Sequence, residues 1–382
     1  MPITSTGPDS LDIRWVDTPA ALDAACADLA SAEILALDTE FFRESTFHPV
    51  PALLQLSAGE AVYLIDPQAL DASPALCELL AGGPLKLLHA SSEDLEVLRN
   101  WADVLVAPLV DTQVAQGLLG EDPAMGYQRL VEHWTGETLP KDETRSDWLE
   151  RPLSDAQCRY AALDVVYLLE VWKQQRERLV ELGRLDWLEA DCAELLAQAG
   201  RNGDADGQWY LRHRQLWRLT PRQIDAYRRL TIWREGEARR RNLPRGWLVN
   251  DKLLYAIAEA LPQHRQALAA IEGVKPTLVK REGDTLLALV GEARRADESD
   301  LPEALPSPLA GAFKKRFKAL KRVVSADAEA LGVAPEVLLR RRDLEAVVAA
   351  DLLDRPLPLP KGWRGERLSA RLAAALSEGG EA

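Results

Sequence analysis

The chain has 382 residues, of which 47% are hydrophobic and 28% are charged, and its formal net charge is −14 at pH 7. The length predicts two or three domains, and the composition is typical of a soluble globular protein. No apolar run approaches the roughly 18 residues that a membrane-spanning helix needs. The first ten residues lack the pattern of a secretory signal, and the four cysteines form no CxxC pair that would suggest a zinc site. We therefore expect a cytoplasmic protein that is not bound to a membrane.

The first 200 residues have the pattern of an α/β domain. Short apolar segments predict four strands, at residues 34–38, 51–56, 61–65 and 85–89, and residues 104–110 are a candidate fifth. Gly59 and Glu60 are the expected turn between the second and third strands, so the sheet starts antiparallel. Helical patterns follow at about residues 112–119, 126–135 and 154–181. This order predicts a mixed sheet with helices packed around it.

Serine residues mark two of the expected helix starts. Ser154 precedes the long helix as a candidate N-cap. Ser91 and Ser92 form a cap-like start for a further helix after the fourth strand.

The second half of the chain is predicted to be helical. Residues 201–207 and 296–308 have the polar or proline-rich composition of linkers. Helical patterns lie between and after them, at residues 221–241, 251–261, 264–271, 275–293 and 309–378. A basic-Gly-Trp element occurs at both 245–247 and 361–363, and residues 248–254 resemble residues 338–344. We therefore expect a diverged internal duplication.

Charge differs strongly between the two halves. Residues 1–200 hold 13 Lys and Arg against 35 Asp and Glu, whereas residues 201–382 hold 33 against 25. The acidic half could bind cations and the basic half a polyanion, although charged surfaces are commonly just solvated.

Asp38 and Glu40 stand two residues apart at the end of the first predicted strand. Side chains alternate along a strand, so both carboxylates should point to one face of the sheet. Two such oxygen ligands suit Mg²⁺ or Mn²⁺, although an acid pair after a strand is often a solvated loop.

Asp94 is expected in the first turn of the helix that follows the fourth strand. It could simply interact with the helix N-terminus. Glu93 could serve that purpose equally well, which leaves Asp94 free to face the sheet.

Tyr160 and Asp164 lie one helical turn apart among small and apolar residues. A buried carboxylate is rarely left without a partner. The pair could form a hydrogen bond within the core, or it could belong to a metal site together with the earlier acids.

The order and spacing of these five residues resemble the signature of DEDD-type exonucleases of the tyrosine subclass. The flanking sequence is similar to that of the bacterial ribonuclease D family, in LDTEFFRESTFHP at 37–49, ALLQL at 52–56, LLHASSEDLEV at 87–97, LPKDETRSDW at 139–148 and QCRYAALDVVYL at 157–168. The helical blocks resemble the HRDC domains that this family shares with RecQ helicases, the last block more diffusely.

The resemblance implies a ribonuclease H-like exonuclease domain, with a mixed sheet flanked by helices, at residues 1–205. It also implies two all-α HRDC-like domains, at residues 210–294 and 305–380.

The resemblance further implies a 3′→5′ exoribonuclease that releases nucleoside 5′-monophosphates. The four acids Asp38, Glu40, Asp94 and Asp164 would hold two divalent ions, Mg²⁺ or Mn²⁺, and Tyr160 would position the attacking water. The expected substrate is RNA with a free 3′ end, such as a tRNA precursor, and no obligate protein partner is implied.

Several other residues are candidates for contacting RNA. Phe41 could stack on the terminal base, and Lys141 and Arg145 could contact phosphates near the scissile bond. Arg239, Arg240 and Arg241 form the strongest basic cluster of segment 212–245, which holds eleven arginines against three acids. The aromatic residues in this segment and just after it, Trp217, Tyr227, Trp233 and Trp247, are expected mainly to pack in helix faces.

Two alternatives compete with an exoribonuclease. The same chemistry could act on DNA, because the acids do not read the 2′-hydroxyl. A non-catalytic nucleic-acid-binding protein would be favoured by loss of any of the five residues, and all five are present. His89 is not expected to be a metal ligand.

Overall fold

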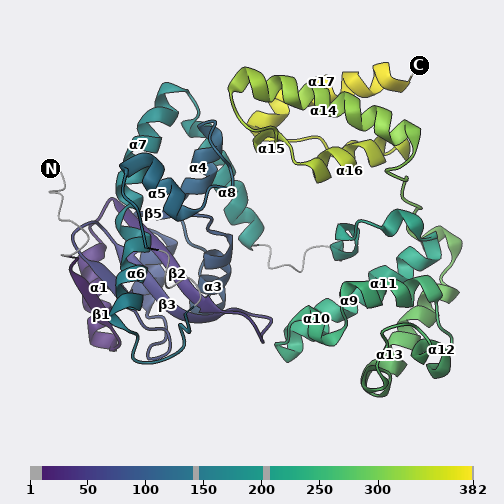
Figure 1. Cartoon of the computed structure of the whole chain (residues 1–382), viewed down its shortest axis with the longest axis horizontal. Helices are drawn as coiled ribbons and strands as arrows, with labels where there is room; N and C mark the ends of the chain where they lie inside the picture. The colour runs from purple at the N-terminus through teal and green to yellow at the C-terminus, as the bar shows by residue number, and fades with distance from the viewer. Residues whose placement is uncertain (1–10, 141–145, 201–206, 381–382) are drawn as a thin grey trace.

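The N-terminal part of the chain is built on a six-stranded mixed sheet (Figure 1). The structure is a computed structural model that describes residues 11–140, 146–200 and 207–380. The strands, in their order across the sheet, are β1 (Ile13–Val16), β4 (Val62–Ile65), β3 (Val50–Ser57), β2 (Ile34–Phe42), β5 (Leu85–Leu88) and β6 (Leu109–Asp111). β3 pairs antiparallel with both β2 and β4, whereas the other pairs are parallel. The expected mixed sheet and antiparallel start are confirmed.

The strand predictions need two corrections. β1 was not expected, because its place in the sheet depends on parallel pairing with β4, some 50 residues further along the chain. The segment predicted as a strand at residues 104–110 forms one only over Leu109–Asp111, where it pairs with β5. An apolar run alone does not show how many of its residues pair with a neighbouring strand.

Eight helices surround the sheet within the described part of this region. They are α1 (Pro19–Leu29), α2 (Pro74–Ala81), α3 (Ser92–Ala102), α4 (Thr112–Leu118), α5 (Tyr127–Thr135), α6 (Asp155–Val166), α7 (Leu168–Glu181) and α8 (Leu185–Gly200). The predicted single helix at 154–181 is therefore two helices, which meet at Tyr167. The break lets α6 pack on β2, β3 and β4 while α7 packs on β2 and β5. Ser154 caps α6 in a reciprocal capping box with Gln157, as the sequence predicts.

The two faces of the sheet carry separate apolar cores. Leu35 and Leu37 of β2 point into a core shared with α1, α2 and α3. Ala36, between them, points into the core on the opposite face, where Ala162 of α6 and Trp172 of α7 are packed. This alternation sends the side chains at positions 38 and 40 toward α6.

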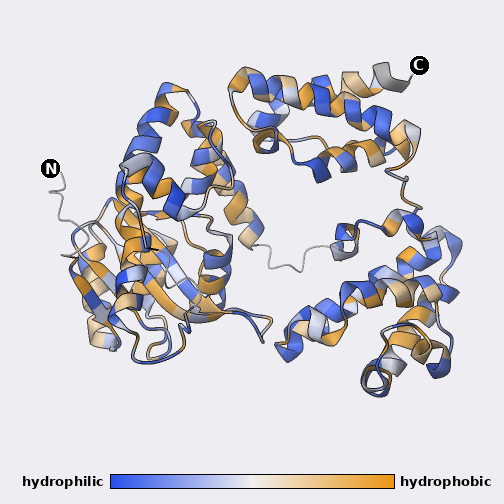
Figure 2. Ribbon diagram, in the orientation of Figure 1, coloured by the Kyte–Doolittle hydropathy of each residue, from blue (hydrophilic) through white to orange (hydrophobic). Residues whose placement is uncertain are grey.

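The rest of the described chain is helical, as predicted. The first block contains η1 (Trp209–Arg212), η2 (Leu216–Arg218), α9 (Pro221–Arg241), α10 (Arg245–Leu248), α11 (Asp251–Ala260), α12 (Arg265–Ala269) and α13 (Pro276–Arg295). The second contains α14 (Gly311–Leu331), α15 (Pro335–Leu338), α16 (Arg341–Leu352) and α17 (Gly362–Gly380), and η3 (Glu298–Asp300) lies between the two blocks. No helix of the described residues is both long enough and apolar enough to cross a membrane. Figure 2 shows that hydrophilic and hydrophobic residues alternate along these helices.

The helical blocks share a local arrangement that supports the expected duplication. In each pair of helices, α9 and α14, α10 and α15, α11 and α16, the second begins 90 residues after the first, as at Pro221 and Gly311. α9 and α14 both end in a left-handed residue, Asn242 and Gly332. The basic-Gly-Trp elements are not equivalent, however, because Trp247 lies on α10 and Trp363 on α17.

The first helical block contacts the connection between β2 and β3. Phe47 of that connection is buried against Ala238 and Leu248. The Oδ1 atom of Asn242, at the end of α9, accepts hydrogen bonds from the backbone N–H groups of Phe47 and His48, each at 3.0 Å. The strand that carries Asp38 and Glu40 therefore continues directly into a contact with the helical block.

The second helical block contacts α8. The indole of Trp363 stacks on Trp187 with ring centroids 4.3 Å apart, and its Nε1 donates to Asp191 at 3.0 Å. Nearby, a Cβ atom on Gly120 would lie 2.2 Å from the carbonyl oxygen of Gly332, so only glycine fits there. Both helical blocks thus contact the sheet-containing region, while residues 296–310 connect one block to the other (Figure 1).

Candidate active site

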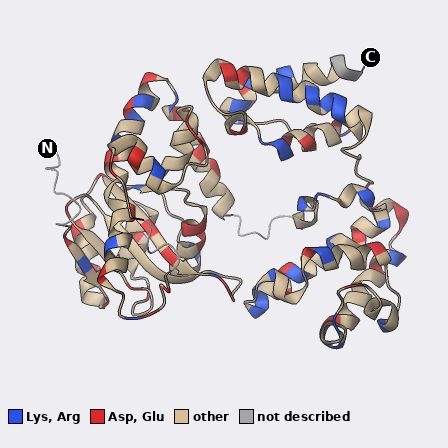
Figure 3. Ribbon diagram, in the orientation of Figure 1, with Lys and Arg blue, Asp and Glu red and all other residues tan. Residues whose placement is uncertain are grey.

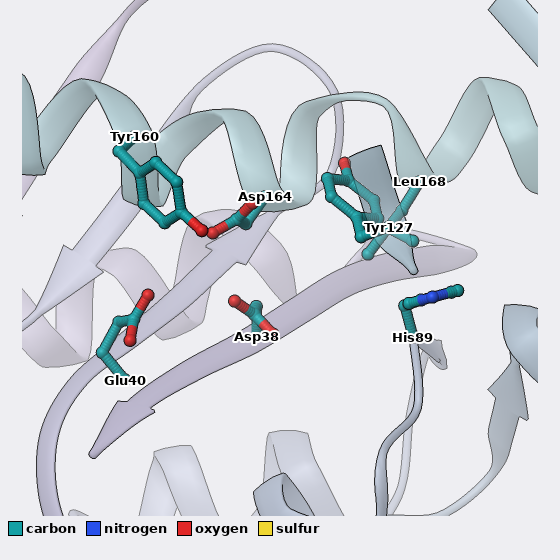
Figure 4. Close-up of a pocket in the computed structure, with 7 residues that line it drawn as sticks. All are labelled: Asp38, Glu40, His89, Tyr127, Tyr160, Asp164 and Leu168. Atoms are coloured by element: carbon teal, nitrogen blue, oxygen red, sulfur yellow. The ribbon is translucent and has the colours of Figure 1, made fainter. Parts of the chain in front are cut away.

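Two of the predicted acids project together from β2. Asp38 pairs across the sheet with Gln55, and Glu40 with Leu53. Their carboxylates, with that of Asp164, offer three oxygen atoms that all lie within 4.8 Å of one another. The sequence prediction that these side chains share one face is confirmed (Figure 4).

Helix α6 supplies Asp164 and Tyr160. Figure 4 shows the phenol of Tyr160 directed toward the carboxylates of Asp164 and Glu40. The helix is fixed over the site from a second side, because Tyr127 of α5 donates a hydrogen bond from its hydroxyl to the carbonyl oxygen of Leu163 at 2.9 Å. The spacing of four residues therefore places both α6 side chains at the acid cluster.

Asp94 lies beside this cluster rather than within the group of three oxygens. It sits in the first turn of α3, is 7% exposed, and accepts a hydrogen bond from the hydroxyl of Thr39 at 2.6 Å. Glu93 is exposed, as expected if Asp94 is the acid that faces the sheet. The predicted serine cap is wrong in detail, because Ser91 makes no side-chain cap bond to the helix and instead donates to Asp111.

The acids disfavour one another's charge. Burial, followed by repulsion from neighbouring carboxylates, raises the pKa of Glu40 to about 8 and that of Asp164 to about 7. Burial raises the pKa of Asp94 to about 7 and that of Asp38 well above its usual range. Hydrogen bonds, such as those from Thr39, lower the pKa values of Asp38 and Asp94 and act in the opposite direction. A divalent cation would relieve this repulsion, and a donor set made only of carboxylate oxygens fits Mg²⁺ or Mn²⁺.

The acids border a cavity of about 220 Å³. Its lining consists of Asp38, Glu40, His89, Tyr127, Tyr160, Asp164 and Leu168 (Figure 4). The ring of His89 has Nδ1 3.0 Å from the hydroxyl of Thr112 and Nε2 2.9 Å from the carbonyl oxygen of Met125. Both ring nitrogens thus have protein partners.

The sequence reasoning assigned no site role to Tyr127 or Leu168. Tyr127 is the first residue of α5, and Leu168 lies just after the break between α6 and α7. Their place in the wall depends on how α5 and α7 pack on the sheet, for which the local sequence carries no signal.

The predicted RNA-contacting residues do not form one cluster as the acids do. Phe41 is half-buried at the end of β2, just past a bulge. Lys141 and Arg145 lie outside the described residues.

The arginine cluster that ends α9 is engaged within the protein. Arg239 lies over the ring of Phe47, with 5.1 Å between guanidinium carbon and ring centroid. Arg241 pairs with Glu237 and Glu282, each at 2.6 Å. Arg240 also pairs with Glu237, yet its side chain is 66% exposed, so it is the member best placed to meet a ligand.

Of the aromatic residues in and just after segment 212–245, two pack in a helical core as expected and one is exposed. Tyr227 is buried in the core of the first helical block, and Trp233 packs against that core. Trp247 on α10 is instead 63% exposed.

Two family models match the chain. The model of a 3′-5′ exonuclease matches residues 13–179, and that of an HRDC domain matches residues 223–290. Ribonuclease D of Pseudomonas paraeruginosa is 42% identical over 369 residues, covering 96% of this chain and 98% of the relative. Ribonuclease D of Escherichia coli is 34% identical over 380 residues, covering 96% and 99%.

The fold is also similar to a solved structure. The crystal structure of Escherichia coli RNase D, described as an exoribonuclease involved in structured RNA processing, superposes with a TM-score of 0.88 at 32% identity. The match covers 96% of this chain and 99% of that one.

Proposed function

This chain belongs to the ribonuclease D family, and from its acid cluster we infer that it is a 3′→5′ exoribonuclease that hydrolyses RNA to nucleoside 5′-monophosphates. The observation that supports this most directly is the set of three carboxylates, from Asp38, Glu40 and Asp164, whose oxygens converge at a cavity that Tyr160 also lines. The family supplies the choice of RNA, because the acids themselves carry no information on the sugar.

We assign the divalent ions, Mg²⁺ or Mn²⁺, to Asp38, Glu40, Asp164 and Asp94. When bound, two such ions would lower the pKa of a water molecule and stabilise the leaving 3′ oxygen. Asp94 is adjacent to the three clustered acids and would join them by giving up its contact with Thr39 or by sharing it. Because the acids have raised pKa values, ion binding must displace protons, so it should strengthen with pH.

Tyr160 is the residue to which we assign orientation of the attacking water. Its phenol shares the cavity with the acids, and it comes from the helix that carries Asp164, one turn away. A hydroxyl held there can hydrogen-bond the water and assist removal of its proton. His89 and Tyr127 form the rest of the polar wall, where they would meet the terminal nucleotide.

The three-part organisation completes the proposal. Residues 1–205 would form the catalytic domain, residues 210–294 an HRDC domain and residues 305–380 a second HRDC-like domain. Figure 3 shows acids gathered on the first part and lysines and arginines on α9, α10 and α14. Such basic surfaces would attract RNA to an otherwise acidic enzyme. We propose tRNA precursors in the cytoplasm as substrates, and of the predicted contacts we retain Phe41, Lys141, Arg145 and Arg240. Arg239 contacts Phe47 of the catalytic part, and Arg241 joins α9 to α13 within the first helical block.

The test is cleavage of 5′-labelled RNA, with a DNA of matched sequence, in Mg²⁺, in Mn²⁺ and in chelator. We expect metal-dependent shortening from the 3′ end, which a 3′-phosphate slows because the terminal nucleotide must enter the cavity. Cleavage inside the strand, or activity in chelator, would contradict the proposal. Faster shortening of DNA than of RNA would favour a DNA exonuclease instead.

Three variants locate the activity. Asp38→Asn should abolish shortening, and Tyr160→Phe should slow it by about 10²-fold or more, since it removes a positioned hydroxyl. Glu93→Gln is the matched control, because it neutralises an exposed acid next to Asp94. Equal activity of Asp38→Asn and Glu93→Gln would show that the acid cluster is not the active site.

A further inference from the structure

The first helical block contains a second cavity, of about 650 Å³, that the acid cluster does not use. It lies between the segment that leads into α9 and helices α9, α10 and α11. Its lining residues are Trp209, Arg212, His213, Arg214, Gln215, Tyr227, Thr231, Arg234, Glu235, Arg245, Asp251, Lys252 and Tyr255. Cations and aromatic rings thus make up most of its wall.

The positive charge of this wall exceeds what its acids neutralise. The lining has five Lys and Arg residues but only two acids. Both acids already form ion pairs, Glu235 with Arg245 and Asp251 with Arg234. Within the described part of the chain, the other three cations, Arg212, Arg214 and Lys252, form no ion pair.

Two further observations indicate that this cavity binds an anion. Arg234 is 7% exposed, and its Nε atom, although buried, has no hydrogen-bond partner among the described residues. Burial, then repulsion from Arg342 and Arg245, lowers the pKa of Arg212. Arg342 belongs to the second helical block, so cations from two blocks lie near Arg212, and the attraction from Glu235 does not offset burial and their repulsion.

The rings of the cavity are arranged for contact with planar groups. His213 stacks on Tyr255 with centroids 5.0 Å apart and an angle of 20° between the planes. The guanidinium of Arg212 lies 3.7 Å from the centroid of the Trp209 ring, and that of Arg245 lies 5.4 Å from it. Layers of rings and guanidinium planes are surfaces on which nucleic-acid bases stack, while phosphates bind the outer nitrogens of the same guanidinium groups.

Arg245 connects this cavity to the catalytic part of the protein. Its guanidinium lies 4.5 Å from the ring centroid of Phe47, in the connection that continues β2. We propose that the cavity binds a nucleotide of the RNA strand upstream of the 3′ end, with its phosphate at Arg212 and Lys252 and its base against the rings of Trp209 and His213. This inference rests on the proposed function, because it takes the strand held there to be the substrate.

The first experiment measures RNA binding in chelator, where no cleavage occurs. The double variant Arg212→Ala/Lys252→Ala removes two cations that have no ion-pair partner among the described residues. The matched control Lys275→Ala/Lys280→Ala removes two exposed cations at the start of α13, outside the cavity. With a fluorescent single-stranded RNA, we expect the cavity variant to bind about tenfold more weakly. Its plot of log K against log salt should be shallower by about 1.4, the value for two phosphates of a single strand. Equal affinities and slopes for the two double variants would overturn the proposal.

The second experiment identifies the ligand. RNA that carries 4-thiouridine should crosslink on irradiation to residues 209–215 or to Tyr255, and an excess of unlabelled RNA should suppress the crosslink. Uridine 5′-monophosphate is the competing probe, because a product nucleotide has the same chemistry as one nucleotide of the strand. If it saturates the cavity and the RNA gives no crosslink there, the cavity is a product site and the proposal is wrong.

Kinetics separate this inference from the proposed function. The cavity variant should raise KM for a long RNA and leave kcat unchanged, and it should hydrolyse a dinucleotide as the wild type does, because a dinucleotide occupies only the catalytic cavity. If the wild type cleaves neither substrate, the proposed function fails. If the wild type cleaves both and the cavity variant matches it on the long RNA, only the nucleotide site fails.

Discussion

Replacing Glu40 with glutamine should stabilise the metal-free protein at alkaline pH. Burial, together with repulsion from Asp164 and Asp94, raises the pKa of Glu40 from 4.5 to about 8. The folded state therefore binds this proton more tightly than the unfolded chain does. The stability that the group contributes is fully present below pH 4.5 and is lost as the pH rises toward 8. The amide introduced by Glu40→Gln does not titrate, so the variant should avoid this loss.

The size of the effect follows from the same values. The interval from 4.5 to about 8, at 1.36 kcal/mol per pH unit, gives a ceiling of about 5 kcal/mol. Relaxation and water entry reduce such penalties in real proteins, and Glu40 is only half-buried, so we expect about 1–3 kcal/mol above pH 8. For a domain of this size, that gain raises the unfolding midpoint by several degrees.

The assay is thermal unfolding followed by circular dichroism, in chelator, at pH 5.5 and 8.5 and constant ionic strength. The midpoint of Glu40→Gln minus that of the wild type should be small at pH 5.5 and clearly positive at pH 8.5. Glu93→Gln, which neutralises an exposed acid, should show no such change. Parallel pH profiles for Glu40→Gln and the wild type would refute the reasoning.

Adding metal should reverse the order of the two unfolding midpoints, so that the wild type becomes the more stable protein. Mg²⁺ or Mn²⁺ binds the ionised carboxylates, so it should raise the midpoint of the wild type more than that of Glu40→Gln, and more at pH 8.5 than at pH 5.5. The variant should also lose exonuclease activity. Increased stability with decreased activity is the combination expected of a functional acid cluster.

Three further substitutions test contacts that hold the fold together. Lys86→Met should lower the free energy of unfolding in urea by about 3 kcal/mol, because the buried Lys86 ammonium group donates to three backbone carbonyls that would lose their partner. Gly120→Ala should expose the second helical block to limited proteolysis, because its Cβ atom would clash with the Gly332 carbonyl. Gly136→Ala is its control, since Gly136 also has a positive φ but no neighbour within 4 Å, so equal proteolysis of the two would exclude the clash. Asn242→Gly keeps the left-handed helix end but leaves two backbone N–H groups of the β2–β3 connection without their partner. Proteolytic cleavage of that connection should therefore become faster. An unchanged cleavage rate would mean that this contact does not hold the connection.

Features that depend on residues only a few positions apart could be predicted from the sequence. Alternation along a strand placed Asp38 and Glu40 on one face, and the spacing of four placed Tyr160 and Asp164 on one side of a helix. Ser154 was identifiable as a cap for the same reason, since its partner Gln157 is three residues away. Each of these inferences needs only the geometry of a single element.

Only the tertiary structure decided which elements meet. It placed Asp94 against Thr39, 55 residues away in sequence, and made His89 part of the cavity wall. It also joined Phe47 to Asn242, across 195 residues. Such contacts arise when whole faces pack together, and the periodicity of one segment does not specify the face that another segment presents to it.

The basic residues illustrate the same limit. The sequence indicated that segment 212–245 is rich in arginine, but it could not distinguish Arg241, which pairs with Glu282, from Arg212, which lines a cavity without an ion-pair partner among the described residues. Composition determined that the second half could attract RNA. Which of these charges can contact RNA depends on the acids that folding places beside them. An arginine that forms an ion pair within the protein is less able to bind a phosphate, and the sequence does not show which arginines are paired.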